Sequence, residues 1–199
     1  MKDAVLYIHG KGGDAAESAR YKTLFPGYEV FGADYQTFTP WETGAEIRAA
    51  AEKLKAAYEN VVLVANSIGA FFSMNAGLDG LIRRAYFISP IVDMEKLIGG
   101  MMLLANVTEA ELRARDVIRT DFGEELSWAY LCYVRDHPVR WNVPTHILYG
   151  EKDALTDMET VRAFAEKHGA TLTVMENGEH WFHTAEQMRF LDDWIKFYL

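Results

Sequence analysis

The sequence predicts an α/β fold, a three-layer sandwich in which helices cover both faces of a mostly parallel sheet of about six strands. Its apolar runs are near-continuous rather than alternating, which is typical of strands that are covered on both faces. Segments of helix length separate most of these runs, and parallel neighbours need such crossover connections. The predicted strands span residues 4–8, 29–33, 61–65, 85–89, 145–149 and 171–175.

The first long helix has an explicit start signal. Residues 39–42 read TPWE, with Thr39 as the N-cap, proline at the first helical position and Glu42 as the partner of a capping box. The helix is expected to run to about Tyr58, because apolar residues recur along it at three- and four-residue spacing. These residues are Ile47, Ala50, Ala51, Leu54 and Tyr58.

Two later helices carry similar signals. Thr156 with Glu159 predicts a second capping box, and Gly169 after two basic residues predicts the end of that helix. Thr184 with Gln187 predicts the start of the last helix. The residues expected on the buried face of this helix are Met188, Leu191, Ile195 and Tyr198.

Residues 91–142 interrupt the alternation of strands and helices. This segment is too long for one crossover and holds candidate helices near residues 94–103, 109–116 and 123–136. We expect it to form a helical cap over the carboxyl edge of the sheet, where the ligands of such folds gather. No repeat, low-complexity tract or linker marks off a second domain, so residues 1–199 are predicted to form a single domain that carries this cap.

The composition argues against a nucleic-acid-binding protein and against a membrane protein. Of 199 residues, 50% are hydrophobic and 25% are charged, which is ordinary for a soluble globular protein. The formal net charge is -9 and the basic residues do not cluster, so we expect no nucleic-acid partner. No apolar run suits a signal peptide or a membrane span, so we expect no membrane partner. Cys132 is the single cysteine and is expected to be a buried hydrophobe; with no internal disulfide, the expected location is cytoplasmic.

The stretch from Val61 to Gly69, VVLVANSIG, is the most informative part of the chain. A buried strand runs directly into a serine between small residues, which approximates the G-x-S-x-G nucleophile elbow. In that motif a sharp strand-to-helix turn lifts a serine hydroxyl clear of the sheet. Ala65 replaces the first glycine, which is tolerable where the backbone needs no positive φ. The alternative is a helix that simply uses Ser67 as its N-cap.

A serine hydroxyl is a poor nucleophile at neutral pH, so Ser67 needs a base to take its proton and an acid to orient that base. Asp153 follows the fifth predicted strand and His180 follows the sixth, so both lie in loops at the carboxyl edge of the sheet. Asp157 is the fallback for the acid, although we expect it in the first turn of the helix that Thr156 caps.

Two other chemistries fit the same loops less well. The spacing of His180 and His183 suits a metal ion, but no third ligand accompanies the pair. Residues 10–13, GKGG, follow a strand as phosphate-binding loops do, yet they match neither the dinucleotide fingerprint nor the P-loop. We therefore expect no metal ion and no cofactor.

A fourth motif, IHGKGG at residues 8–13, completes the set. It resembles the His-Gly loop that follows an early strand in the α/β-hydrolase superfamily, and the chain order of serine, aspartate and histidine is also that of this superfamily. The resemblance runs from about residue 4 to the C-terminus and implies a compact, six-stranded member. It further implies an oxyanion hole formed by the backbone N–H groups of Lys11 and Ile68, with His9 shaping the loop.

The resemblance predicts a serine hydrolase that cleaves a carboxylic ester or a related acyl compound through an acyl-enzyme on Ser67. His180 would shuttle the proton and Asp153 would hold the imidazole. Thioesterases, peptidases and cofactor-free perhydrolases of this fold use the same three residues, so the expected partner is described only as a small-molecule acyl substrate. The alternative from another class is a non-catalytic protein that binds a small ligand or a partner on this fold. The sequence predicts no oligomeric state.

Overall fold

The computed structural model describes residues 2–199. The chain divides into two compact units, the first running up to Val92 and resuming at Arg140–Leu199, the second spanning Asp93–Val139. Each unit is described by itself. Within residues 2–199, no helix combines the length and the hydropathy needed to cross a bilayer.

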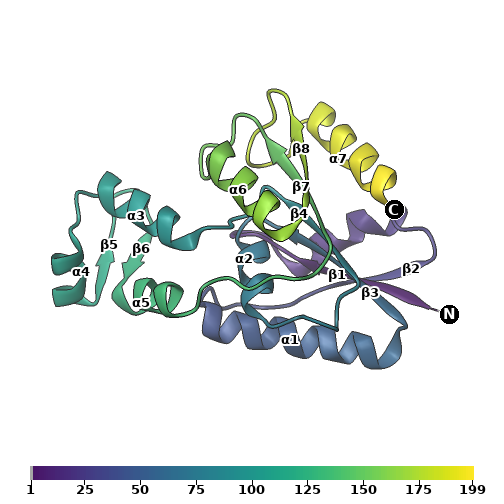
Figure 1. Ribbon diagram of the computed structural model, residues 1–199, viewed down its shortest axis with the longest axis horizontal. Helices are drawn as coiled ribbons and strands as arrows, with labels where there is room; N and C mark the ends of the chain where they lie inside the picture. Colours follow the sequence, from purple (N-terminus) through teal and green to yellow (C-terminus); the bar gives the residue numbers. More distant parts are fainter. Residues whose placement is uncertain (1) are drawn as a thin grey trace. The chain divides into compact units, whose positions relative to one another are not determined.

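The first unit is built on a six-stranded sheet whose neighbouring strands are all parallel, in the order β2-β1-β3-β4-β7-β8 (Figure 1). The prediction of a mostly parallel, six-stranded α/β sheet is therefore confirmed, and each predicted strand end lies within one residue of its observed position. The strands are β1 (Asp3–Ile8), β2 (Tyr28–Gly32), β3 (Asn60–Asn66), β4 (Arg84–Ile88), β7 (Thr145–Gly150) and β8 (Thr171–Met175).

Helices cover both faces of this sheet because alternate strand residues point to opposite sides. On one face Tyr7, Val64 and Leu148 belong to a buried cluster that also takes in Tyr21 and Trp194. On the other face two helices contact β1 and β3. The elements around the sheet are the 3₁₀-helix η1 (Ala15–Thr23), α1 (Pro40–Ala57), α2 (Ile68–Asn75), α6 (Met158–His168) and α7 (Ala185–Tyr198). The sandwich thus has the three predicted layers.

The order of the strands places a topological switch point at the carboxyl ends of β1 and β3. The chain passes from β1 to the edge strand β2, and then returns past β1 to form β3 on its other side. The loops that follow β1 and β3 therefore leave in opposite directions, which is the topological switch point where ligands of open α/β sheets bind. Ile8 pairs with Ala65, so these two strands end side by side.

Both predicted capping boxes are wrong. Thr39 is the N-cap of α1, but its hydroxyl donates to the Glu42 carboxylate at 2.6 Å and makes no cap bond to the backbone. At α6 the N-cap is Asp157, which accepts a hydrogen bond from the backbone N–H of Thr160 at 2.9 Å. Thr156 stands outside that helix, because its own N–H is held by Asp153.

The predicted start of the last helix at Thr184 is confirmed, and the structure forms a capping box there. The Thr184 hydroxyl accepts a hydrogen bond from the backbone N–H of Gln187, and the Gln187 side chain accepts one from the N–H of Thr184. The side chain of Gln187 also accepts from the N–H of His183 at 3.0 Å, so this one buried glutamine fixes the loop that leads into α7.

The second unit contains α3 (Met94–Leu104), α4 (Glu109–Arg115), α5 (Trp128–Asp136) and an antiparallel pair, β5 (Val117–Arg119) with β6 (Glu125–Ser127). The prediction of a helix from residue 123 is wrong at its beginning, because the chain first turns back on itself at Gly123, which has a φ of 88°. Ser127 then caps α5. That residues 91–142 act as a cap stays a prediction.

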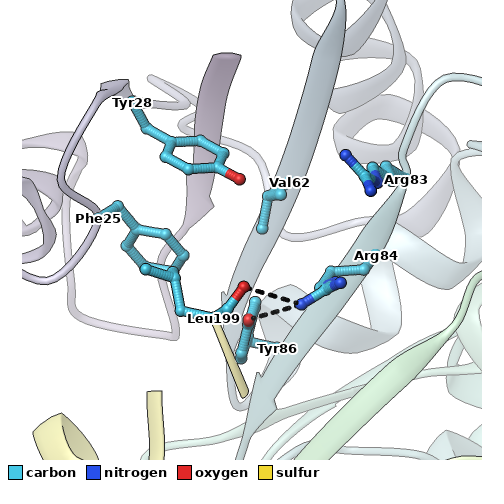
Figure 2. Close-up of a pocket in the computed structure, with 7 residues that line it drawn as sticks. All are labelled: Phe25, Tyr28, Val62, Arg83, Arg84, Tyr86 and Leu199. Carbon is cyan, nitrogen blue, oxygen red and sulfur yellow. Dashed lines mark hydrogen bonds between the residues drawn. The ribbon is translucent and has the colours of Figure 1, made fainter. Parts of the chain in front are cut away.

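A small cavity of about 180 Å³ lies at the amino edge of the sheet, where β3 and β4 begin (Figure 2). Beside it the Tyr86 hydroxyl donates to the backbone carbonyl of Tyr198 at 2.8 Å, and Arg84 Nη1 donates to the same carbonyl at 2.5 Å. These bonds fasten the end of α7 to β4. Since Ser67 follows the carboxyl end of β3, this cavity lies at the opposite edge of the sheet from the candidate nucleophile.

The observed N-cap of α6 gives a first prediction. Asp157→Ala removes the side chain that satisfies the Thr160 amide, which should lower stability by about 1 kcal/mol. For a chain of this length that is a fall in Tm of about 2–4 °C by thermal melting. Thr156→Ala should change Tm by less, because the buried Thr156 hydroxyl has no hydrogen-bond partner among residues 2–199. A larger effect at Thr156 than at Asp157 would contradict the observed cap.

Candidate active site

Ser67 occupies a sharp turn between β3 and α2. Its φ of 52° and ψ of -121° lie outside the regions that side-chain-bearing residues favour, and such strain persists only where the surrounding structure enforces it. Ser67 stands at the N-cap position of α2 but makes no side-chain cap bond. The reading of this serine as a helix cap is therefore wrong, and its hydroxyl makes a different contact.

The residues around Ser67 explain how the turn forms. The Ser67 N–H donates to the carbonyl of Ile88 at 2.9 Å, and its own carbonyl accepts from Ile91 at 3.1 Å, so the strained residue is held on both sides. Gly69 is needed because a Cβ there would lie 2.5 Å from the carbonyl oxygen of His9. Ala65 belongs to β3 and has no positive φ, which is why alanine serves in place of the first glycine of the motif.

The three residues predicted as nucleophile, base and acid lie in one hydrogen-bonded row. Ser67 Oγ is 2.8 Å from His180 Nε2, and His180 Nδ1 is 2.7 Å from Asp153 Oδ2. A carboxylate only accepts hydrogen bonds, so Nδ1 carries the hydrogen and Nε2 is left to accept from the serine hydroxyl. The imidazole is 19% exposed and the carboxylate 0% exposed. The histidine can therefore meet a substrate while the acid stays out of water.

Both oxygens of the buried Asp153 carboxylate accept hydrogen bonds. Its Oδ1 accepts from the backbone N–H groups of Leu155 at 2.8 Å and Thr156 at 3.1 Å, while Oδ2 accepts from His180. Buried charge is tolerated only when it is paired and hydrogen-bonded in this way.

The neighbouring Tyr149 hydroxyl stays protonated. Burial, followed by the nearby charges of Asp153 and Asp157, raises the pKa of Tyr149 to about 12, so its hydroxyl stays a donor to the Thr156 carbonyl.

Two glycines bring the acid loop and the histidine loop together, a signal that the sequence analysis missed. A Cβ on Gly150 would lie 2.5 Å from the carbonyl oxygen of Glu179, so the two backbones touch where β7 ends. A Cβ on Gly178 would in turn lie 3.1 Å from the Cα of Gly150. Lys152 also donates its N–H to the Gly178 carbonyl at 2.7 Å. This contact sets the distance between Asp153 and His180.

Asp157, the fallback for the acid, caps α6, whereas the carboxylate bonded to His180 is that of Asp153. His183, the other histidine of the loop after β8, donates from Nδ1 to the carbonyl of Trp181 at 2.7 Å. His183 also lies 3.5 Å from the Glu179 carboxylate. Among residues 2–199, no group of three or more histidine, cysteine, aspartate and glutamate side chains is arranged to hold a metal ion.

The loop after β1 lies against the serine turn. A Cβ on Gly10 would be 3.2 Å from Cβ of Ser67. The Gly10 carbonyl accepts from His9 Nδ1 at 2.9 Å and from the N–H of Gly13 at 3.2 Å. Because a trans peptide unit points its C=O and N–H in opposite directions, these bonds also direct the Lys11 N–H. Ile68 is the first residue of α2, where an N–H group has no acceptor within the helix.

Below this loop, η1 is joined to β1 through two side chains. The Tyr7 hydroxyl donates to the Glu17 carboxylate at 2.5 Å, and Glu17 lies directly against Gly13, where a Cβ would be 2.7 Å from Glu17 Oε1. Burial raises the pKa of Tyr7, and the neighbouring Tyr21 and Glu17 raise it further. The tyrosine therefore remains protonated and keeps its bond to Glu17.

No family model matches the chain, and no curated protein sequence matches it. Solved structures do match its fold. Est1E from Butyrivibrio proteoclasticus aligns with a TM-score of 0.78 at 16% identity, over 98% of this chain and 86% of that chain. Alpha/beta hydrolase domain-containing protein 10 from mouse aligns with a TM-score of 0.73 at 16% identity, over 98% and 88%.

A third match is a monoacylglycerol lipase from Paleococcus ferrophilus, with a TM-score of 0.63 at 17% identity, over 98% of this chain and 95% of that chain. These three structures share the parallel sheet and its flanking helices with the present chain across nearly its full length. The chain therefore has the α/β-hydrolase fold.

Proposed function

We propose that the protein is a serine hydrolase that cleaves a carboxylic ester or a related acyl compound. The observation that carries this proposal is the unbroken hydrogen-bond row from Ser67 Oγ through His180 to the buried Asp153. Nucleophile, base and orienting acid are all within hydrogen-bond distance, which is the geometric requirement for activating a serine. The fold adds a consistent setting, but other functions also occur on it.

In the proposed reaction, Ser67 Oγ attacks the substrate carbonyl while His180 Nε2 takes the serine proton. Asp153 accepts from Nδ1 and stabilises the positive charge on the imidazole. The carbonyl oxygen gains a negative charge, to which the N–H groups of Ile68 and Lys11 would donate. His180 then gives its proton to the leaving group as the acyl–oxygen bond breaks.

The second half of the reaction returns the enzyme to its starting state. Water attacks the acyl group on Ser67, His180 takes one proton from that water, and the serine leaves with the proton that His180 returns. The products are an alcohol and a carboxylic acid. No metal ion or cofactor takes part in this scheme, and the same residues would serve a thioester, a peptide bond or a peracid.

The substrate class is best approached with a panel of acyl compounds. A structure of Est1E has ferulic acid bound, with a TM-score of 0.76 at 15% identity, and another relative in fold is called a monoacylglycerol lipase. The panel should therefore compare nitrophenyl esters of increasing acyl length, a hydroxycinnamate ester, a monoacylglycerol and an acyl thioester. We expect the oxygen esters to be turned over fastest.

The role of Ser67 gives the second prediction. Ser67→Ala should abolish both labelling by a fluorophosphonate probe and hydrolysis of a short-chain nitrophenyl ester, because no other residue would supply the attacking oxygen. The matched control is Ser73→Ala, which removes a buried hydroxyl on α2 that donates to the Gly69 carbonyl. Undiminished labelling of Ser67→Ala would refute the proposal. A wild-type protein that never reacts with the probe would instead indicate an inert binding protein on this fold.

The role of Asp153 gives the third prediction. Asp153→Asn should lower kcat by about 10⁴-fold, because an amide can donate to Nδ1 and thereby move the histidine hydrogen onto Nε2, where it cannot accept the serine proton. Asp157→Asn is the control, since asparagine caps helices as well as aspartate does. Steady-state hydrolysis of a nitrophenyl ester measures both variants. Equal activity in the two would remove Asp153 from the mechanism.

A further inference from the structure

A buried tyrosine holds the loop that lies against the candidate nucleophile. Tyr35 follows β2 and is 2% exposed. Its ring stacks flat on the imidazole of His9, with ring centroids 4.0 Å apart and an angle of 5° between the planes. Its hydroxyl donates to the backbone carbonyl of His9 at 2.5 Å. One side chain thus fixes both the ring and the carbonyl of the residue that begins the loop.

Tyr35 is itself held firmly in place. Its ring meets Phe38 and Phe72 edge-on, with centroids 5.9 Å and 6.0 Å away. Burial raises the pKa of Tyr35, and the negative charge of Glu17 raises it further, so the hydroxyl stays a donor at any physiological pH. Phe38 in the same loop and Phe72 on α2 therefore fix the position from which this hydroxyl reaches His9.

The bonds to His9 and Gly10 determine where two successive amides point. The His9 carbonyl lies between the Tyr35 hydroxyl and the backbone of Gly69, and the Gly10 carbonyl accepts from His9 Nδ1. Each peptide unit is planar and trans, so fixing its carbonyl fixes the N–H on its other side. The N–H groups set in this way belong to Gly10 and Lys11.

We propose that Tyr35 is a positioning residue for the oxyanion loop: it orients the backbone of residues 9–11 so that an amide faces the oxygen that becomes negative when Ser67 attacks. This inference rests on the proposed function and deepens it. An oxyanion donor acts only if it is aimed before the charge develops. Loss of the Tyr35 hydroxyl should therefore weaken binding of the transition state and leave binding of the substrate unchanged.

The experiment compares Tyr35→Phe with Tyr86→Phe. The two tyrosines are a matched pair, since Tyr86 is 1% exposed and its hydroxyl also donates to a backbone carbonyl, but at the opposite edge of the sheet. For a nitrophenyl ester, Tyr35→Phe should lower kcat by about 10- to 100-fold with KM unchanged, as expected for a misplaced catalytic group. Tyr86→Phe should lower Tm to a similar degree and leave kcat as in the wild type.

A trifluoromethyl ketone tests the oxyanion directly. Ser67 Oγ adds to its carbonyl carbon, the serine proton passes to His180, and the ketone oxygen becomes the anion that the loop would bind. Its inhibition constant should rise in Tyr35→Phe by the same factor by which kcat falls. Hydrogen exchange should speed up in the peptide that covers residues 9–13 in Tyr35→Phe, and at the end of α7 in Tyr86→Phe.

The outcomes separate this inference from the proposed function. If the wild type is active and Tyr35→Phe behaves like Tyr86→Phe in kcat and in inhibitor binding, the positioning role is wrong and the proposed function stands. If KM rises while kcat is unchanged, Tyr35 acts on substrate binding and the inference is again overturned. If the wild type neither reacts with the fluorophosphonate probe nor hydrolyses any ester, the proposed function fails and the positioning role fails with it.

Discussion

The candidate site depends on close contact between backbones at the carboxyl ends of the parallel strands. Gly69 comes within reach of the His9 carbonyl, and Gly150 comes within reach of the Glu179 carbonyl, at separations that leave no room for a Cβ. The first contact joins the serine turn to the loop after β1, and the second joins the acid loop to the histidine loop. Larger residues at either glycine would push these loops apart and break the row of hydrogen bonds.

Around these contacts, hydrogen bonds hold the groups that position the reacting side chains. The buried Asp153 carboxylate is held by two backbone amides and by His180, so its charge is compensated inside the protein. Near the loop after β1, the Tyr35 hydroxyl donates to the backbone carbonyl of His9, and the Tyr7 hydroxyl donates to the Glu17 carboxylate on η1. The side chains that would react are thus carried by a frame that is set before any substrate binds.

The strands of the sheet and the edge at which the candidate site lies can be predicted from the sequence. Near-continuous apolar runs predict all six strands of the sheet, because parallel strands are buried on both faces. The position of each polar residue just after a strand predicts that Ser67, Asp153 and His180 lie at one edge, and the structure brings these three side chains together. Strand ends are predictable since they follow from local burial, and the carboxyl ends of parallel strands share an edge.

Other features depend on contacts that a single sequence does not display. Thr156 and Asp157 are both good N-caps, and only the capture of the Thr156 N–H by Asp153 decides between them. The β5–β6 hairpin pairs residues 117–119 with residues 125–127, where the sequence predicts a helix from residue 123. Tyr35 gains its place through stacking on His9, 26 residues away in the chain. Such long-range contacts also decide where Gly150 and Gly178 meet.

The role of Ser67 as nucleophile is tested by locating the covalent adduct that forms with an activated acyl compound or a fluorophosphonate. The protein would be treated briefly, digested and analysed by peptide mass spectrometry, alongside a His180→Ala variant. We expect a single modified residue, Ser67, in the wild type and little or no adduct in His180→Ala, since the serine would then have no base. An adduct on another residue, or equal modification of Ser67 without His180, would contradict this expectation.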